Sequence, residues 1–192
     1  MAVADISSVT IPAQELQRVA SAHFRRPNLN LIDHTQRRDK YQRFCVPLHK
    51  ATLKGDWKTA KRILDQDQSL ACTAIAKGWS TVLHVAAGSN HIHFVDELVK
   101  EVNPEDLELQ DVNGNTAFSI ATPTGNLQIV EIMKRKNKDP LIRGAQGTTS
   151  LHVAVLQGQS DMAWHLYPET IQAFHDYTDW IVLLFCWVNN EI

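Results

Sequence analysis

The feature that most constrains this chain is a short pattern that recurs four times in its central part. The copies begin at residues 46, 81, 116 and 149 and read VPLHKATLKGDW, TVLHVAAGSNHI, TAFSIATPTGNL and TSLHVAVLQGQS. Successive copies are therefore 35, 35 and 33 residues apart. Self-similarity at a nearly fixed period indicates a repeat architecture, in which each unit buries its apolar face only against its neighbours.

Each position of the pattern has a physical reason. Thr at the first position suits a helix N-cap, because its hydroxyl accepts from the free N–H groups there. Pro47 suits the first helical turn, and the small Ala at the sixth position lets neighbouring helices approach. Position ten is Gly in three copies and Asn90 in the second, and both residue types tolerate left-handed backbone. We expect structural roles for Leu48, His49, Ala51, Gly55, Leu83, His84, Ala86, Gly114, Thr116, Ala121, Gly125, Gly147, Thr149, Leu151, His152, Ala154 and Gly158.

A second helix is predicted after each copy of the pattern. Apolar residues recur there at helical spacing, and they are Phe94, Val95, Leu98 and Val99 in the second unit and Leu127, Val130 and Met133 in the third. Turn sequences with Gly follow at residues 111–116 and 144–149. The predicted fold class is therefore all-α, a solenoid of stacked helix-turn-helix units with turn or β-hairpin connections.

The flanks of the chain lack the pattern. We expect an N-terminal arm at residues 1–42, partly disordered and with a short helix at 10–24, then about four repeats at 43–167. A divergent apolar tail is expected at 168–192. Residues 25–43 hold six basic and two acidic residues, which favours either a solvated arm or one that contacts nucleic acid or anionic lipid. The apolar run at 180–188 has three interpretations: it seals the last repeat, it is exposed and prone to aggregation, or it has no selected structure.

Residues 46–167 resemble ankyrin repeats, whose signature is T-P-L-H-x-A at a period of 33 residues. They also resemble the N-terminal repeat region of a plant group, the PGG-motif membrane-anchored ankyrin family. That resemblance rests on LHKATLKGDWKTAKRILDQD, LHVAAGSNHIHFVDELV, NPEDLELQDVNGNTAFSIA and PLIRGAQGTTSLHVAVLQG. It implies a cytoplasmic protein-interaction domain, tethered at the inner face of the plasma membrane and involved in stress or defence signalling. The group also has further repeats and a membrane-spanning half, so we expect this chain to be a truncated form.

Composition excludes several other classes of protein. Lys plus Arg is 19 and Asp plus Glu is 21, whereas a dedicated nucleic-acid binder is usually strongly basic. The longest apolar run covers residues 180–188, which is far below the roughly 18–20 residues of a membrane span. The three cysteines are far apart in the sequence, which argues against a disulfide framework and favours a reducing compartment.

No pattern in the sequence indicates catalysis. The motifs of serine hydrolases, zinc proteases and phosphate-binding loops are absent, so we predict no enzyme activity, no catalytic residue, no cofactor and no metal. His84, His91 and His93 lie close enough in sequence to raise a zinc site as an alternative. His91 and His93 would diverge on a helix, and we interpret His84, like His49 and His152, as a structural histidine that bonds an adjoining turn.

Charge is unevenly distributed along the repeats. Residues 96–111 contain seven acidic side chains and one basic, and residues 134–143 contain five basic side chains and one acidic. The two stretches fit either a solvated outer face or a polar patch that orients a protein partner.

The ankyrin resemblance implies non-catalytic protein binding at the turn tips and at the exposed side of the first helices. In this chain those positions are Lys54, Lys77, Trp79, Ser80, Ser89, Val112, Asn113, Asn115, Thr124, Gln146, Thr148 and Gln157. Trp79 stands where the repeat usually has Gly, and it either anchors a partner or fills a groove between repeats. The alternative function is that of a membrane-peripheral regulator, which docks on lipid through the basic arm and the apolar tail.

Overall fold

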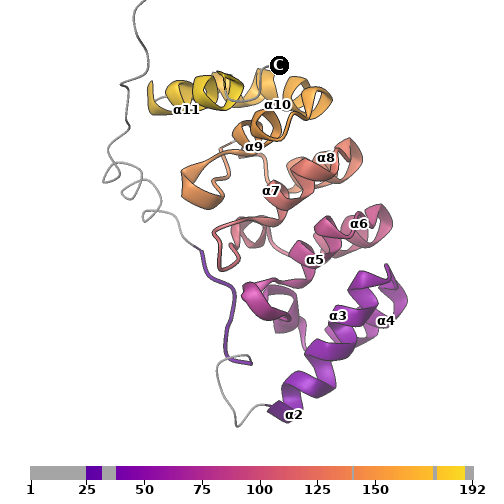
Figure 1. The fold of residues 1–192 in the computed structure, drawn as a ribbon. Helices are drawn as coiled ribbons and strands as arrows, with labels where there is room; N and C mark the ends of the chain where they lie inside the picture. The colour runs from indigo at the N-terminus through magenta and orange to yellow at the C-terminus, as the bar shows by residue number, and fades with distance from the viewer. Residues whose placement is uncertain (1–24, 32–37, 140, 175–176, 189–192) are drawn as a thin grey trace, which may run out of the picture.

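The structure is a computed structural model, and it describes residues 25–31, 38–139, 141–174 and 177–188. The arm before residue 25, including the helix predicted at 10–24, lies outside the described residues. The described part is a stack of antiparallel helix pairs (Figure 1). The first helices of the pairs, here called inner, are α3 (Val46–Leu53), α5 (Val82–Gly88), α7 (Ala117–Ala121) and α9 (Ser150–Leu156). The second, outer helices are α4 (Trp57–Leu64), α6 (Ile92–Glu101), α8 (Leu127–Lys136) and α10 (Ser160–Gln172).

Side-chain caps and left-handed residues set the ends of these helices. At the start of α7 the Thr116 hydroxyl accepts from the backbone N–H of Ser119 (3.2 Å), and at the start of α4 the Asp56 carboxylate accepts from the N–H of Thr59 (3.0 Å). After the inner helices the chain reverses through residues with φ between +60° and +70°: Gly55, Asn90, Gly125 and Gly158. Left-handed backbone carries little penalty for Gly and is tolerated by Asn.

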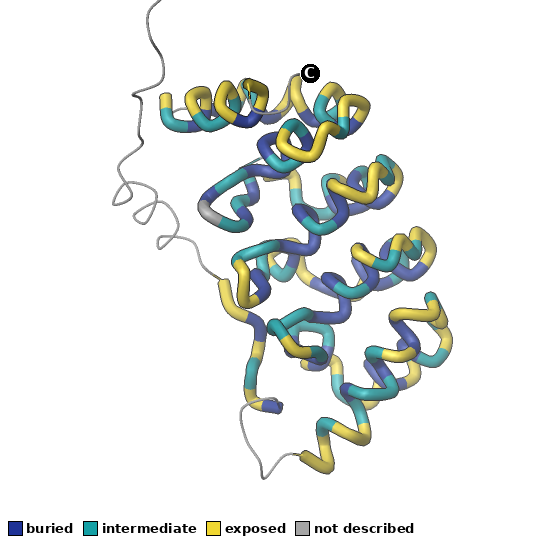
Figure 2. The backbone as a smooth tube through the Cα atoms, in the orientation of Figure 1, coloured by how far each residue is buried: buried dark blue, intermediate teal, exposed yellow. Residues whose placement is uncertain are grey.

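The core lies between the inner and outer helices and between successive pairs. The pattern alanines Ala86, Ala121 and Ala154 are fully buried, so neighbouring inner helices pack closely. From the outer helices, Phe94 and Leu98 enter the same core. Figure 2 shows buried residues where the pairs meet and exposed residues on the outer rim.

Connections between the pairs consist of turns and short helices. The short helices are η3 (Gln68–Cys72), η4 (Lys77–Trp79), η5 (Pro104–Glu108) and η7 (Ala145–Gly147), while η6 (Thr122–Thr124) lies within the third pair, between α7 and α8. Within the described residues no sheet forms, and the antiparallel hairpins are reduced to the isolated bridges Gln110–Thr116 and Arg143–Thr149. The predicted all-α solenoid of helix pairs is confirmed.

The two ends of the stack depart from the repeat. At the start, α2 (Arg38–Lys40) and η2 (Tyr41–Cys45) run directly into α3, so the first inner helix is extended. At the other end, α10 crosses the boundary expected between residues 167 and 168, and a further helix, α11 (Tyr177–Val188), packs on α9. None of the helices in the described segments is long and apolar enough to span a bilayer.

Candidate protein-binding surface

The turn tips, at residues 77–80, 111–115 and 144–148, form a continuous row along the stack. The backbone N–H of Val112 donates to the carbonyl of Gly78 (2.8 Å), which joins the first tip to the second. The second and third tips are also in contact, because a Cβ added at Gly114 would lie 3.1 Å from the Cα of Ala145. Three units therefore present one surface.

The central tip is held in shape by Asp111. Its carboxylate accepts from the backbone N–H groups of Asn113 and Asn115, each at 2.8 Å. Asp111 itself is buried, whereas the Val112 side chain is 49% exposed. The tip therefore presents its side chains on a backbone that is fixed before any partner arrives.

The structure divides the predicted partner-binding residues into two rows. On the tips, Lys77, Val112 and Asn113 are exposed, while Trp79, Ser80, Asn115 and Thr148 are half-buried. Gln146 lies in η7, and its side chain is outside the described part of the chain. The second row, Lys54, Ser89, Thr124 and Gln157, lies at the opposite ends of the inner helices. The structure therefore brings the tip residues together and places the others about one inner helix away.

Trp79 has the backbone conformation of the glycine it replaces. Its φ is +64°, beside +83° at Gly114 and +73° at Gly147, the equivalent residues of the next tips. The guanidinium of Arg26 lies 5.5 Å from the centre of its ring. A residue of the N-terminal arm thus lies on the side chain that the sequence singled out as a possible anchor.

The described part of the arm, residues 25–31, docks beside the tips (Figure 1). The backbone N–H of Asn28 donates to the carbonyl of Cys72 (2.9 Å), and the N–H of Gln110 donates to the carbonyl of Arg25 (2.8 Å). Arg25 also forms ion pairs with Glu105 (3.4 Å) and Glu108 (3.1 Å). The sequence allowed a loosely docked arm but did not indicate where it docks, although the basic arm and the acidic stretch at 96–111 were a signal for these contacts.

The buried histidines of the pattern join successive units. The Nε2–H of His84 donates to the carbonyl of Asn115 on the next tip (3.0 Å), and its Nδ1 accepts from the N–H of Thr81 (3.3 Å). His152 bonds Thr149 in the same way and donates to the carbonyl of Asp179 (2.9 Å). Burial lowers the pKa of both imidazoles, so they are neutral at pH 7.

Two units lack this histidine bond. In the third unit Ser119 stands at the position, and its hydroxyl bonds only within the start of its own helix, to Thr116. His49 of the first unit is half-buried and makes no such bond to a neighbouring turn within the described residues. The histidine contacts are therefore strongest at the second and fourth inner helices.

A second series of bonds between units was missed from the sequence. In the second, third and fourth units the residue after the left-handed position donates to the preceding unit: His91 to the carbonyl of Leu53 (2.9 Å), and Asn126 to the side-chain oxygen of Asn90 (2.6 Å). Gln159 likewise donates to the carbonyl of Pro123 (3.2 Å). Three residue types share one position and one role, so a pattern based on residue identity does not reveal it.

Comparison with known proteins agrees with this geometry. A family model described as ankyrin repeats, in three copies, matches residues 48–144 and 83–178. The chain belongs to the ankyrin-repeat family. It is also similar to the ankyrin repeat and SAM domain-containing protein 6 of Mus musculus, with 31% identity over 108 residues, which is 56% of this chain. The aligned part is 12% of that protein, and these matches do not distinguish among ankyrin subfamilies.

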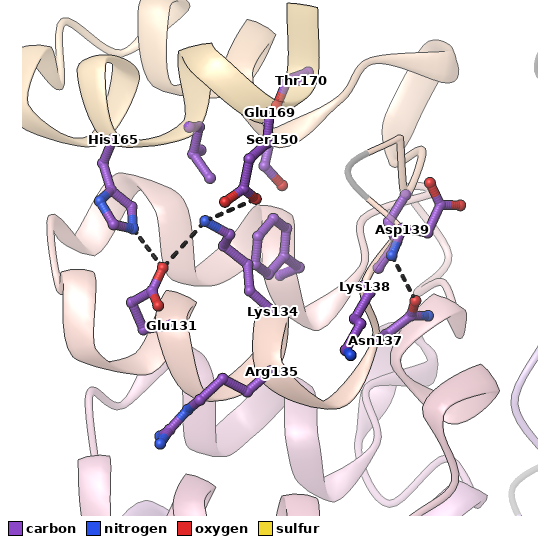
Figure 3. Close-up of a pocket in the computed structure, with 13 residues that line it drawn as sticks. Glu131, Lys134, Arg135, Asn137, Lys138, Asp139, Ser150, His165, Glu169 and Thr170 are labelled. Atoms are coloured by element: carbon purple, nitrogen blue, oxygen red, sulfur yellow. Dashed lines mark hydrogen bonds and ion pairs between the residues drawn. The ribbon is translucent and has the colours of Figure 1, made fainter. Parts of the chain in front are cut away.

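A cavity of about 500 Å³ lies between the outer helices of the third and fourth ankyrin repeats (Figure 3). At its rim Lys134 pairs with Glu131 and Glu169, both at 3.1 Å, and His165 hydrogen bonds to Glu131. The hydroxyl of Ser150 is buried in its wall and has no hydrogen-bond partner among the residues that the structure describes. Because Glu131, Lys134 and Glu169 already pair with one another, we interpret this cavity as loose packing between two repeats, although Arg135 and Lys138 also line it.

The ankyrin histidines and the charged stretches are largely used inside the fold. Among the described residues no group of three His, Cys, Asp or Glu side chains is placed to hold a metal ion. Lys134 of the basic stretch and Glu105 of the acidic stretch both have partners within the chain. Part of each stretch therefore contacts the chain's own side chains.

Proposed function

We propose that this chain is a non-catalytic protein-binding module whose principal contact surface is the row of turn tips. The observation that carries the proposal is the continuity of that row, in which Val112 bonds the tip before it and Gly114 touches the tip after it. Ankyrin repeats are in general interaction modules, which agrees with such a surface.

The row suits binding because it is fixed in advance. Ordering a loop at an interface costs free energy, and Asp111 has already ordered the central tip. A partner that contacts Lys77, Val112 and Asn113 would therefore meet an exposed cation, an apolar side chain and an amide in defined positions. The second row, from Lys54 to Gln157, would extend the contact to the inner helices.

Proximity labelling with the full chain as bait, followed by affinity measurement on the captured protein, tests this proposal. We expect Val112→Asp with Asn113→Ala to weaken the complex at least tenfold. The matched control is Lys58→Ala on the exposed face of α4, which should leave it unchanged. Equal affinity for the tip variant and the parent chain would move the binding surface elsewhere.

We also propose a setting for this binding, on the strength of the sequence resemblance to the plant PGG-motif family. The chain would act in stress or defence signalling in the cytoplasm, at the inner face of the plasma membrane. Imaging of the tagged chain in plant cells, at rest and after salt or elicitor treatment, tests this setting. A distribution that never includes the cell periphery would contradict it.

The second candidate function is docking on lipid, which the exposed aromatic side chains of α11 favour. Trp180 and Trp187 are 43% and 56% exposed, and Trp is enriched at membrane interfaces. The basic arm supports it less, since Arg25 and Lys40 already pair with acidic side chains of the repeats. Flotation with anionic liposomes, with and without residues 1–45, tests it. Floating of both chains would support docking through α11, floating of the full chain alone would support docking through the arm, and floating of neither would contradict lipid docking.

A further inference from the structure

The helix α11 occupies the place of a fifth inner helix. It packs on α9 as α9, α7 and α5 pack on their predecessors, and Figure 1 shows it continuing the stack. The hydrogen bond that His84 sends to Asn115 of the next unit has its counterpart in the bond from His152 to the carbonyl of Asp179. The end of the stack is therefore built as the beginning of another unit.

No outer helix follows α11 in the part of the chain that the structure describes. Where such a helix would pack, an apolar groove of about 450 Å³ runs between α10 and α11. Trp164 and Tyr167 line it from α10, and Trp180, Leu184 and Trp187 line it from α11. Trp164 is 71% exposed, so the groove presents aromatic surface that a row of apolar side chains can cover.

The side of α11 next to this groove is apolar as well. Ile181, Phe185 and Val188 are 37%, 39% and 58% exposed, and together they form a stripe at helical spacing. The one charged residue of α11, Asp179, is buried against Arg143. A helix that is apolar on all sides is normally covered on all sides.

We propose that this end face is the interface of a two-fold symmetric dimer, in which the stripe of each α11 fills the α10–α11 groove of a second copy. A two-fold interface needs a surface that is complementary to itself. Each copy supplies both halves of such a contact, because α11 carries the stripe and also forms one wall of the groove. The exposed residues of α11 carry no charge, so bringing two copies together costs no repulsion between like charges.

The area of the face fits a stable dimer. Six aromatic residues of α10 and α11 are between 37% and 86% exposed: Trp164, Tyr167, Tyr177, Trp180, Phe185 and Trp187. An aromatic side chain buries about 150–250 Å² when it is enclosed. With Ile181, Leu184 and Val188 the face offers roughly 800 Å² per copy, which is the usual size of a specific interface.

Sedimentation equilibrium of the full chain tests the proposal. The wild-type chain should be dimeric at tens of micromolar. Leu184→Glu in the groove and Phe185→Glu in the stripe should each weaken the dimer by at least about 30-fold, the factor that a hot-spot contact carries. The matched control is Leu53→Glu, because Leu53 and Leu184 are 49% and 52% exposed and Leu53 lies at the far end of the stack. This control should leave the dimer intact.

Hydrogen exchange on the wild-type chain gives a test that needs no variant. The amides of α11 should exchange more slowly at 100 micromolar than at 1 micromolar, while those of α5 should not change. A wild-type chain that is monomeric at 100 micromolar overturns the proposal, and so does a dimer that survives both α11 variants. If the wild-type chain is monomeric and binds to phosphatidylcholine vesicles while Leu184→Glu does not, the face is instead a lipid-binding surface.

Discussion

At the scale of single residues, Trp79 tests how the repeat handles a left-handed position. A Cβ in left-handed backbone costs roughly 1–2 kcal/mol, and Gly avoids that cost. Both Trp and Ala carry a Cβ at the φ of +64° found here. We predict that Trp79→Gly is more stable than Trp79→Ala by about 1 kcal/mol in free energy of unfolding, measured by urea denaturation.

The neighbouring residue supplies the control for this prediction. Ser80 has a φ of −66°, where Gly brings no relief and loses more conformational entropy on folding. Ser80→Gly should therefore be less stable than Ser80→Ala. The same order of Gly and Ala at both positions would show that backbone strain does not set the stability at Trp79.

The buried histidines predict how stability depends on pH. Because burial lowers the pKa of His84 and His152 in the folded chain, the unfolded chain takes up protons first as pH falls below about 6.5. Their contribution is fully present above that pH and is lost on acidification. We predict that the double variant His84→Ser, His152→Ser has a flatter dependence of unfolding free energy on pH between 7 and 5. Serine is the residue that the third repeat already has there, and parallel curves for the two chains would contradict the assignment.

Residue patterns predicted the buried positions that recur in each unit better than the contacts between units. Leu83 and Ala86 are buried as their place in the pattern indicates, because an apolar residue at a fixed helical position has one physical explanation. The bonds from His91, Asn126 and Gln159 were not predictable in this way. A donor of any type serves there, and its acceptor is a backbone or side-chain oxygen about 36 residues earlier.

At the scale of elements, one buried ion pair joins α11 to the turn before α9. Both carboxylate oxygens of Asp179 accept from the guanidinium of Arg143, at 2.8 and 2.9 Å, and Asp179 is 6% exposed. Removing one partner leaves the other charge buried, which costs roughly 2–5 kcal/mol. We predict that Asp179→Ala detaches α11 from α9, measured as faster chymotrypsin cleavage at the aromatic residues of α11.

A pair of substitutions distinguishes the effect of the buried charges from the effect of lost side-chain volume. Arg143→Met combined with Asp179→Leu removes both charges and keeps the apolar volume, and such replacements are often neutral or stabilising. The double variant should recover most of the protection of α11 against chymotrypsin. Equal cleavage of the parent chain and Asp179→Ala would mean that apolar packing alone holds the helix.

The sequence predicted the paired helices but not what happens at the ends of the stack. Within a repeat, helical spacing and the turn residues agree, so α5, α6, α7 and α8 follow from local patterns. The extent of α10 beyond residue 167 instead depends on packing, because Leu166 and Thr170 are buried against the last unit. The docking of residues 25–31 depends on contacts about 80 residues apart in sequence, which no local pattern encodes.

At the scale of the whole molecule, the junctions between units are unequal. A solenoid is stabilised by its units and by the interfaces between neighbours. The second and third units are joined by the buried bond from His84 to Asn115. Between the third and fourth units, Ser119 makes no bond of that kind among the described residues. The Gln110 amide donates to the carbonyl of Arg143 there (2.8 Å), but a cavity of about 500 Å³ separates the outer helices. The ion pairs at its rim are partly exposed, and such pairs contribute only about 0–1 kcal/mol each.

This inequality predicts where the molecule opens first. We expect α9, α10 and α11 to open together, with a lower free energy than α5 and α6, because the interface that they would leave lacks the histidine bond and contains the cavity. Native-state hydrogen exchange resolves such cooperative units: a common, smaller opening free energy should appear for amides from α9 onward. It should be measured below the concentration at which α11 becomes covered by a second copy, since association would raise the protection of these same helices. Equal opening free energies from α5 to α10 would show that His84 and the cavity do not divide the stack, and that the four units unfold as one.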